Sequence, residues 1–238
     1  MVEVKVFGSS SKGNGYQLSD GERSLLLEAG INLKWYKAID FSTCDACLIT
    51  HEHDDHAKFA QAMISNSGMD VYLSAGTQEM IQLPKHRTRI VKALEEIKIG
   101  NWTILPFPVE HDVEEPLGFF IQSKDGDCIL FATDTFYIRY RFPGITHMML
   151  ECNYAKDIID EKVAAGKVHP TLRKRIMKSH FELDNVKNFI AANDTSQLQE
   201  IWLLHLSSSN ADAKRFKKEI QELTGVPVSP EDTLKLNL

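Results

Sequence analysis

Long apolar runs are missing from this sequence, and cysteine is scarce. No stretch approaches the roughly 20 apolar residues of a membrane-spanning helix, and the first residues lack the charged and apolar regions of a signal peptide. We therefore expect a cytoplasmic protein with no membrane partner. Four cysteines in 238 residues are too few for a disulfide framework, so we expect buried thiols and no disulfide-linked partner.

Positive charge is not in excess either. The formal net charge is −6, whereas domains that bind nucleic acid are usually basic. This balance does not exclude such a function, because a local basic patch beside a cationic metal site can bind a phosphate backbone. We interpret the basic residues within 85–92 as a solvated face. Those within 167–178 are the better candidate for a nucleic-acid contact surface.

Internal repeats and low-complexity linkers are missing as well. Hydrophobic residues make up 43% of the chain, which is ordinary for a globular protein, and we predict a single domain over residues 1–238. Hydrophobic periodicity and turn residues predict mixed α and β structure. The predicted strands are 2–7, 16–19, 24–28, 45–50, 71–73, 97–99, 102–107, 117–123, 128–133, 146–150, 201–207, 226–228 and 234–236. The predicted helices are 31–41, 57–66, 77–82, 155–179, 185–192 and 210–223.

The most informative stretch runs from Thr50 to His56, where a predicted buried strand ends and an amphipathic helix follows. His51 and His53 are two residues apart, so on an extended backbone they point the same way. Asp55 and His56 follow where the chain turns. The spacing favours two ligands for one metal and two for a second, and imidazole with carboxylate suits zinc, manganese or iron.

Three more polar residues stand at or just after the ends of predicted strands. They are His111, Asp134 and His205. A carboxylate such as Asp134 at the end of an apolar strand is costly unless it is paired with a cation. His111 alone would more often be a structural histidine.

The motif His-x-His-x-Asp-His over residues 51–56 resembles the metal-binding motif of the metallo-β-lactamase fold. The other three residues follow in the order that this fold has. The resemblance implies an α/β (α+β) architecture, an αβ/βα sandwich of two mixed sheets flanked by helices. It also implies two divalent metal ions, zinc or manganese. The implied ligands are His51, His53 and His111 for one metal, Asp55, His56 and His205 for the other, and Asp134 as a bridge.

Other features resemble the phosphodiesterase branches of the fold. The loop Gly-Ser-Ser-Ser-x-Gly-Asn-x-Tyr over residues 8–16 resembles the opening of the YycJ/WalJ-type nucleases, although the loop alone reads as a plain turn. His180 before a helix and the strand-terminal His205-Leu206-Ser207 resemble the tRNase Z and YycJ types. The resemblance therefore implies a nuclease, with DNA as the favoured substrate and exonuclease action.

The resemblance also implies roles for individual residues. A hydroxide held by the metals would be the nucleophile, oriented by Asp55 or Asp134. His180 would contact the scissile phosphate and donate a proton to the leaving oxygen; its alternative role is structural, at the start of a helix. Candidates for substrate contacts are Ser9, Ser10, Asn14, Asn153 and Ser207.

The sequence also departs from the family pattern in places, and other functions remain open. Glu28 stands where the fold usually has Asp-x-Gly, so its carboxylate either supports the site from behind or fails to reach it. The segment between Asp134 and His205 is too short for the insertion of the β-CASP nucleases. A small-molecule hydrolase acting on a thioester, a lactone or a cyclic nucleotide remains an alternative, and so does a non-catalytic binding module. Hydrolysis of β-lactams is disfavoured, because a secretion signal is missing.

Overall fold

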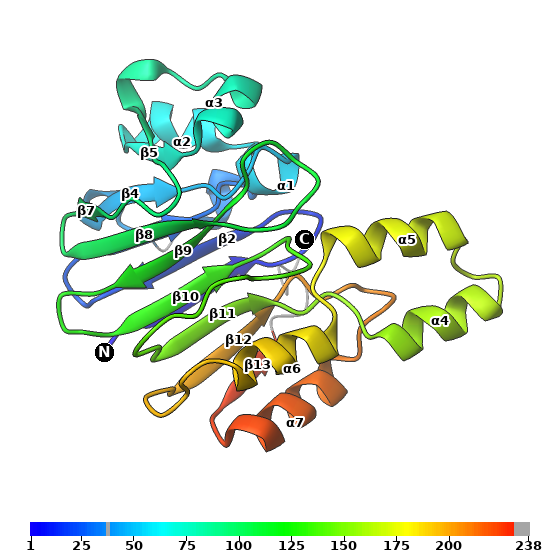
Figure 1. Cartoon of the computed structure of the whole chain (residues 1–238). Coiled ribbons are helices and arrows are strands. Elements are labelled where there is room, and N and C mark those ends of the chain that lie inside the picture. The colour runs from blue at the N-terminus through cyan, green and yellow to red at the C-terminus, as the bar shows by residue number, and fades with distance from the viewer. Residues whose placement is uncertain (37–38, 231–238) are drawn as a thin grey trace. The chain divides into compact units, whose positions relative to one another are not determined.

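The computed structural model describes residues 1–36 and 39–230 (Figure 1). They fall into two compact units. Unit 1 contains Met1–Pro108 and Val113–Asp127, and unit 2 contains Val109–Asp112 and residues 128–230. The strands belong to two mixed sheets flanked by helices, which is the predicted architecture. The predicted strand 234–236 lies outside the described residues, and the single-domain assignment stays a prediction.

Unit 1 contains a six-stranded sheet whose strands follow one another in sequence order. They are β1 (Glu3–Gly8), β2 (Gly15–Ser19), β3 (Ser24–Leu27), β4 (Cys44–Leu48), β5 (Val71–Leu73) and β6 (Thr88–Ile90). The first three pair antiparallel, and β3 to β6 pair parallel. Three further strands pair antiparallel: β7 (Ile97–Ile99), β8 (Trp102–Pro108) and β9 (Leu117–Gln122).

The helices of unit 1 are α1 (Asp54–Ala57), α2 (Ala60–Ser67) and α3 (Ala75–Ile81). Ala60, Met63 and Ile64 recur at helical spacing and lie buried in one apolar cluster with residues of β3, β4 and β5. The helix ends at Gly68, whose φ of +68° is the left-handed conformation that glycine adopts without strain. This packing fixes the turn between β4 and α1, where the motif His-x-His-x-Asp-His lies.

Unit 2 contains four parallel strands in sequence order, β10 (Cys128–Ala132), β11 (His147–Glu151), β12 (Glu200–Leu204) and β13 (Val228–Pro230). Its helices are α4 (Lys156–Ala164), α5 (Pro170–Ser179), α6 (Leu183–Ala191) and α7 (Ala213–Thr224). Every residue of β10 and β11 is buried, as expected of parallel strands covered on both faces. Figure 1 shows α6 and α7 side by side near β12 and β13, whereas α4 and α5 stand apart from them. The carboxyl ends of β10, β11 and β12 meet at one edge, which is where α/β sheets place their functional groups.

Two helix predictions were wrong. The segment predicted as a helix over 31–41 instead has short 3-10 turns at Leu33–Tyr36 and Phe41–Thr43, with residues 37–38 outside the described ranges. Side chains there accept bonds from nearby backbone groups and compete with helix formation, as the Asp40 carboxylate does from Ser42 N–H at 2.9 Å. The segment 155–179 forms two helices, because Gly166 has a φ of +69° and Pro170 begins α5.

The four cysteines are buried free thiols, as predicted. Burial raises the pKa of the Cys47 and Cys152 thiols well above the ordinary value, so both stay protonated at neutral pH. Among the described residues, the helices do not combine the length and the apolar character that crossing a bilayer requires.

Candidate active site

In unit 1, the turn between β4 and α1 brings three histidines together. His51 Nε2 lies 3.1 Å from His53 Nδ1, and the ring of His51 lies 4.1 Å from that of His56, centroid to centroid. His51 and His56 are almost fully buried, whereas His53 is half-buried. The three histidines of the motif therefore lie close together at this turn.

Hydrogen bonds fix which nitrogen of His51 can bind a metal. Thr50 Oγ1 donates its only proton to Glu28 Oε1 at 2.6 Å, so this oxygen must accept from His51 Nδ1 at 2.9 Å. The proton then sits on Nδ1, and Nε2 carries the lone pair. A carboxylate that orients a histidine in this way is typical of metal sites.

Glu28 reaches the site despite its difference from the usual aspartate. It is fully buried, and its Oε1 lies 3.3 Å from His56 Nδ1. One carboxylate thus supports two candidate ligands, His51 through Thr50 and His56 directly. The role of support from behind the site, which the sequence left open, is the one that fits these contacts.

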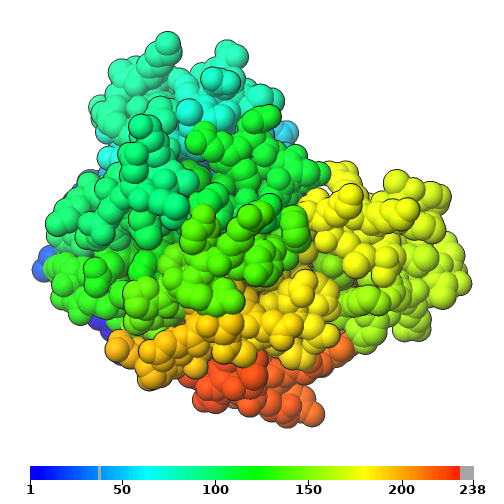
Figure 2. Space-filling view, in the orientation of Figure 1, coloured from blue at the N-terminus to red at the C-terminus, as the bar shows by residue number. Residues whose placement is uncertain are grey.

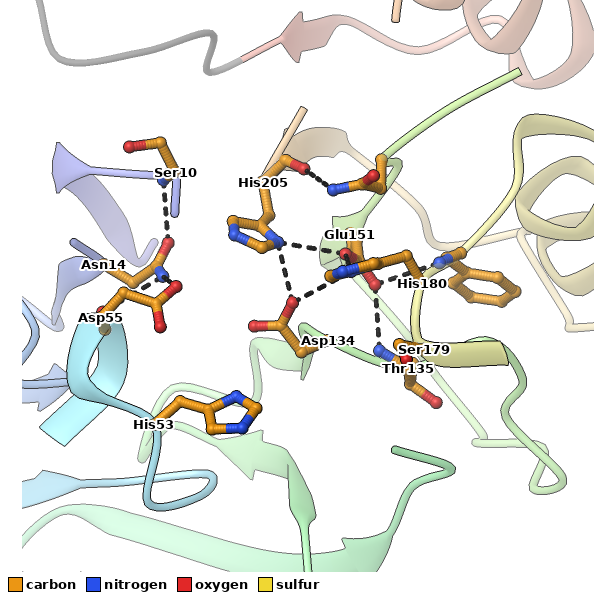
Figure 3. Close-up of polar contacts among 12 residues, drawn as sticks. Ser10, Asn14, His53, Asp55, Asp134, Thr135, Glu151, Ser179, His180 and His205 are labelled. Carbon is orange, nitrogen blue, oxygen red and sulfur yellow. Dashed lines mark hydrogen bonds and ion pairs between the residues drawn. The ribbon is translucent and has the colours of Figure 1, made fainter. Parts of the chain in front are cut away.

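The loop between β1 and β2 packs against the same turn. Asn14 Nδ2 lies 3.0 Å from His56 Nε2 and donates to Asp55 Oδ2 at 3.3 Å. Its Oδ1 accepts from Ser10 N–H at 3.0 Å, a contact drawn in Figure 3. Ser9 Oγ accepts from Tyr16 at 3.0 Å. Ser9, Ser10 and Asn14 are all buried. Asn14 thus holds Asp55 and His56 in place, and Ser10 orients the side chain of Asn14. The predicted contacts of the three residues with substrate stay a prediction.

In unit 2, three residues lie where neighbouring parallel strands end. Asp134 follows β10, Glu151 ends β11, and His205 follows β12. His205 Nδ1 lies 2.8 Å from Asp134 Oδ1 and 3.1 Å from Glu151 Oε1. His180, which follows α5, contacts the same carboxylates, at 2.6 Å from Glu151 and 3.2 Å from Asp134 (Figure 3). The ligand-type atoms of the four side chains lie within 4.8 Å of one another.

Glu151 is held from behind by the backbone. Its Oε2 accepts from the N–H groups of Thr135 at 2.9 Å and Phe181 at 3.1 Å, and its Oε1 faces His180 and His205. Burial raises the pKa of Glu151, but the charge of His180 and the hydrogen bonds from both histidines bring it below the ordinary value. This carboxylate is therefore ionised at neutral pH.

The two carboxylates change the protonation of both histidines. Burial lowers the pKa of His180, but Glu151 and Asp134 outweigh it and raise the pKa to about 10. Burial likewise lowers the pKa of His205, and Asp134 and Glu151 raise it to about 9. In the metal-free protein both imidazoles thus carry a proton on each nitrogen at neutral pH.

His111 lies in unit 2, on the segment after β8. Its Nδ1 lies 3.2 Å from the carbonyl oxygen of Ser179, which can only accept, so Nδ1 donates and Nε2 carries the lone pair. Burial lowers the pKa of His111, which keeps the ring neutral. A neutral imidazole with one nitrogen oriented by a carbonyl is the form that binds metals.

The donor set in each unit fits divalent metal ions. Unit 1 offers His51 through Nε2 and the imidazole of His56, beside the carboxylate of Asp55, and unit 2 offers carboxylates and imidazoles at the ends of β10 to β12. Oxygen and imidazole nitrogen are the ligands of zinc and manganese in hydrolases. These contacts therefore support divalent metal binding and leave the choice of metal open.

The remaining predicted residues lie beside His205. Asn153 Nδ2 donates to the carbonyl oxygen of His205 at 2.8 Å, which fixes the backbone there. Ser207 Oγ accepts from Asn210 N–H at 3.1 Å and closes a turn. The structure thus shows a supporting contact for each, and their contacts with substrate stay a prediction.

Residues 26–191 match a family model described as a beta-lactamase superfamily domain. The chain belongs to this superfamily. Two curated relatives span most of the chain. Exodeoxyribonuclease WalJ of Streptococcus pneumoniae is 27% identical over 227 residues, covering 87% of this chain and 82% of WalJ. Exodeoxyribonuclease YycJ of Bacillus anthracis is 25% identical over 226 residues, covering 88% and 84%.

The chain also shares its fold with solved structures. The metallo-β-lactamase fold protein YhfI of Bacillus subtilis has a TM-score of 0.74 with 17% identity, over 97% of this chain and 96% of YhfI. The predicted fold family is thereby confirmed. With its His and Asp clusters, the chain is a hydrolase of the metallo-β-lactamase fold.

Two residues that orient candidate ligands were not predicted from the sequence. Thr50 links Glu28 to His51, and the carbonyl of Ser179 orients His111. The position of Thr50 directly before the first histidine was a usable signal, because its hydroxyl can reach the neighbouring ring. A backbone carbonyl leaves no signal in the sequence.

Proposed function

We propose that this hydrolase is a metal-dependent nuclease that cleaves phosphodiester bonds of nucleic acid, with DNA as substrate and exonuclease action. The named activity of WalJ and YycJ, which align with most of the chain, supports this choice. The observation that carries the proposal is the contact of His180 with Glu151 at 2.6 Å, beside Asp134. It supplies a charged, oriented proton donor at the candidate metal site.

We propose two divalent ions, zinc or manganese, as cofactors. The proposed ligands are those that the family resemblance implies: His51, His53 and His111 would hold one ion, Asp55, His56 and His205 the other, and Asp134 would contact both. When bound, two such ions neutralise phosphate charge and lower the pKa of water. The orientation of His51 by Thr50 and of His111 by Ser179 supports this assignment, because it leaves a lone pair on Nε2 in both.

The residues of the chain then share the remaining tasks. Asp55 or Asp134 orients the attacking oxygen. His180 faces Glu151 and Asp134 through Nδ1, so its Nε2–H is the proton that can pass to the leaving oxygen. A nucleoside alkoxide is a poor leaving group at neutral pH, and general acid catalysis of this kind contributes about 10² to 10⁴ in rate. Glu151 keeps His180 charged and fixes its direction.

Cleavage of end-labelled nucleic acid tests the proposal. Metal-stripped protein receives zinc or manganese and is then incubated with single-stranded DNA, double-stranded DNA or RNA, beside the variant His180→Ala. His86→Ala is the matched control, because His86 is an exposed histidine on the 3-10 turn Lys85–Arg87 of unit 1.

We expect metal-dependent cleavage by the wild type and by His86→Ala, and loss of cleavage in His180→Ala. Metal-loaded protein that cleaves no nucleic acid would contradict the proposal and favour a small-molecule ester or cyclic phosphodiester as substrate. Unchanged cleavage by His180→Ala would remove His180 from the mechanism.

A further inference from the structure

One face of α5 presents a row of exposed cations. Lys174, Arg175 and Lys178 are all exposed, and so is Thr171 one turn earlier. At 3.6 residues per turn, the three basic side chains leave the helix within an arc of about 100°. They therefore form one surface, which we call the α5 basic face.

A fourth cation of α5 is not part of this surface. Arg173 points toward α4, where its guanidinium pairs with Asp160, and Lys156 pairs with the same carboxylate at 2.7 Å. The hydrogen bond from Arg173 holds the pKa of Asp160 at about 2. The acidic residue of α4 thus neutralises Arg173 and joins the two helices, and it leaves the α5 basic face uncompensated.

Acidic side chains do not neutralise the α5 basic face. Across residues 1–36 and 39–230, no ion pair within 4.0 Å involves Lys174, Arg175 or Lys178. Asp112 is near enough to Arg175 for its carboxyl pKa to be lowered, after the larger effects of burial and His111, but it bonds to Ser179 Oγ at 3.1 Å. An exposed cluster of three cations without partners attracts a polyanion.

The row leads directly to the proposed proton donor. Lys178 stands two residues before His180, and α5 ends at Ser179. From Lys174 to Lys178 the helix rises about 6 Å, which corresponds to about two phosphate-to-phosphate steps of 3.4 Å along one strand, and therefore to about three phosphates. Figure 2 shows α5 (yellow) at the surface of unit 2, beside the yellow-green α4.

We propose that the α5 basic face binds the phosphates of a nucleic-acid strand next to the bond that is cleaved at His180. This inference rests on the proposed nuclease function and names the surface that holds its substrate. Three cations on a rigid helix contact phosphates and not bases. The surface therefore contributes affinity and positions the strand, but it does not discriminate between base sequences. It also explains how a chain of net charge −6 binds a polyanion.

Two other basic surfaces serve as comparison. Arg87 and Arg89 both pair with Asp70, at 3.3 and 2.8 Å, so half of their charge is compensated. On α7, Lys214, Lys217 and Lys218 are exposed in the same unit as α5, and Lys218 lies 3.9 Å from Glu222. The α7 lysines therefore provide a control in which the same charge is removed.

The test measures binding of a fluorescein-labelled oligonucleotide by anisotropy as salt is raised from about 50 to 200 mM, the range over which phosphate contacts weaken strongly. The compared proteins carry His180→Ala, so that substrate is bound and not cleaved. One has in addition Lys174→Gln, Arg175→Gln and Lys178→Gln, and another has Lys214→Gln, Lys217→Gln and Lys218→Gln. If the triple α5 variant does not fold, the three single α5 variants replace it.

Loss of three phosphate contacts lowers the slope of log affinity against log salt by about 2 for a single strand and by nearly 3 for a duplex. We expect this change in the α5 variant, about a third of it in each single variant, and an unchanged slope in the α7 variant. Equal slopes in all proteins, or equal losses in both triple variants, would overturn the inference.

A separate assay distinguishes failure of the inference from failure of the proposed function. Wild-type protein with zinc or manganese is given bis(para-nitrophenyl) phosphate, a diester with no neighbouring phosphates for α5 to bind. If the protein hydrolyses this diester but the triple α5 variant has the same salt slope as its parent, the binding surface is refuted and the proposed phosphodiesterase activity is not. Failure to hydrolyse both the diester and nucleic acid would refute the nuclease, whatever the slope.

Discussion

Replacing Glu151 by glutamine changes a single atom and removes the charge that organises unit 2. The carboxylate accepts four hydrogen bonds, from His180 and His205 at Oε1 and from Thr135 and Phe181 at Oε2. Glutamine has one acceptor oxygen and one NH₂ group. In either orientation of the amide, its NH₂ group takes the place of one carboxylate oxygen. The two N–H groups that donated to that oxygen then have no acceptor.

The size of the effect follows from those lost bonds. Hydrogen bonds to a charged group contribute about 1.5–3 kcal/mol each, so losing two costs about 3–6 kcal/mol. Removing a buried charge recovers part of this, because the desolvation of the carboxylate disappears. We expect the metal-free variant Glu151→Gln to lose about 2–4 kcal/mol in free energy of unfolding, measured by urea denaturation.

The same substitution lowers the pKa of His180. Glu151 is the largest of the effects that raise this pKa to about 10, and burial opposes it. With a neutral amide in place of the carboxylate, only Asp134 remains to counter the lowering of the pKa by burial. We therefore expect the pKa of His180 to fall by more than one unit. Titration of the imidazole resonance by NMR in metal-free protein measures the shift. In the metal-loaded enzyme, activity should decline at a lower pH than in the wild type.

Glu182→Gln is the matched control for this prediction. Glu182 is also a buried carboxylate of unit 2, but it accepts from the backbone N–H groups of Asp184 and Asn185 at the start of α6 and of Lys156 at the start of α4. Its replacement should cost about 1 kcal/mol, as loss of a helix cap does, and should leave the pKa of His180 unchanged. A pKa near 10 that persists in Glu151→Gln would refute the reasoning and assign the shift to Asp134.

Three further predictions concern the same residues. Asp134→Ala should lose metal, measured by elemental analysis, together with activity, and retention of both metals with full activity would refute the bridge. His180→Ala should keep its metals and lose about 10² to 10⁴ in turnover; loss of metal would instead make His180 a ligand. In metal-free protein, the pKa values of His180 and His205, raised to about 10 and 9, imply stability that is fully present below about pH 6.5 and lost as pH rises through both values. The free energy of unfolding should therefore fall by roughly 6 kcal/mol between neutral pH and about pH 10, and constant stability over that range would contradict the pKa values.

Local spacing was enough to predict that ligand-type side chains gather at the turn between β4 and α1. His51 and His53 alternate on an extended segment, and Asp55 and His56 follow in α1, so four ligand-type residues meet without any contact distant in sequence. Asp134 was predictable for a different reason, since a carboxylate at the end of a buried strand requires a cation. Both signals depend on secondary structure that the sequence encodes strongly.

Contacts distant in sequence were harder to predict. Glu151 lies 29 residues from His180 and 54 from His205 along the chain, so their meeting depends on the register of β11 and β12 and on the end of α5. The break between α4 and α5 was missed because the whole basic segment was predicted as one helix, although Gly166 and Pro170 lie inside it. That break matters, because it sets where α5 begins and which of its cations faces α4.

Three residues at or beside the candidate site have an unusual backbone conformation. Glu28, Asp134 and His205 have φ values of +65°, +47° and +51°, which residues other than glycine rarely adopt. Each lies at or just after the end of a strand, and each is buried. Such strain costs about 1–3 kcal/mol per residue and persists where the surroundings fix the backbone, as Asn153 does for His205. Three of the six non-glycine residues with positive φ among the described residues therefore coincide with candidate ligands and their support, at positions where stability alone would favour glycine.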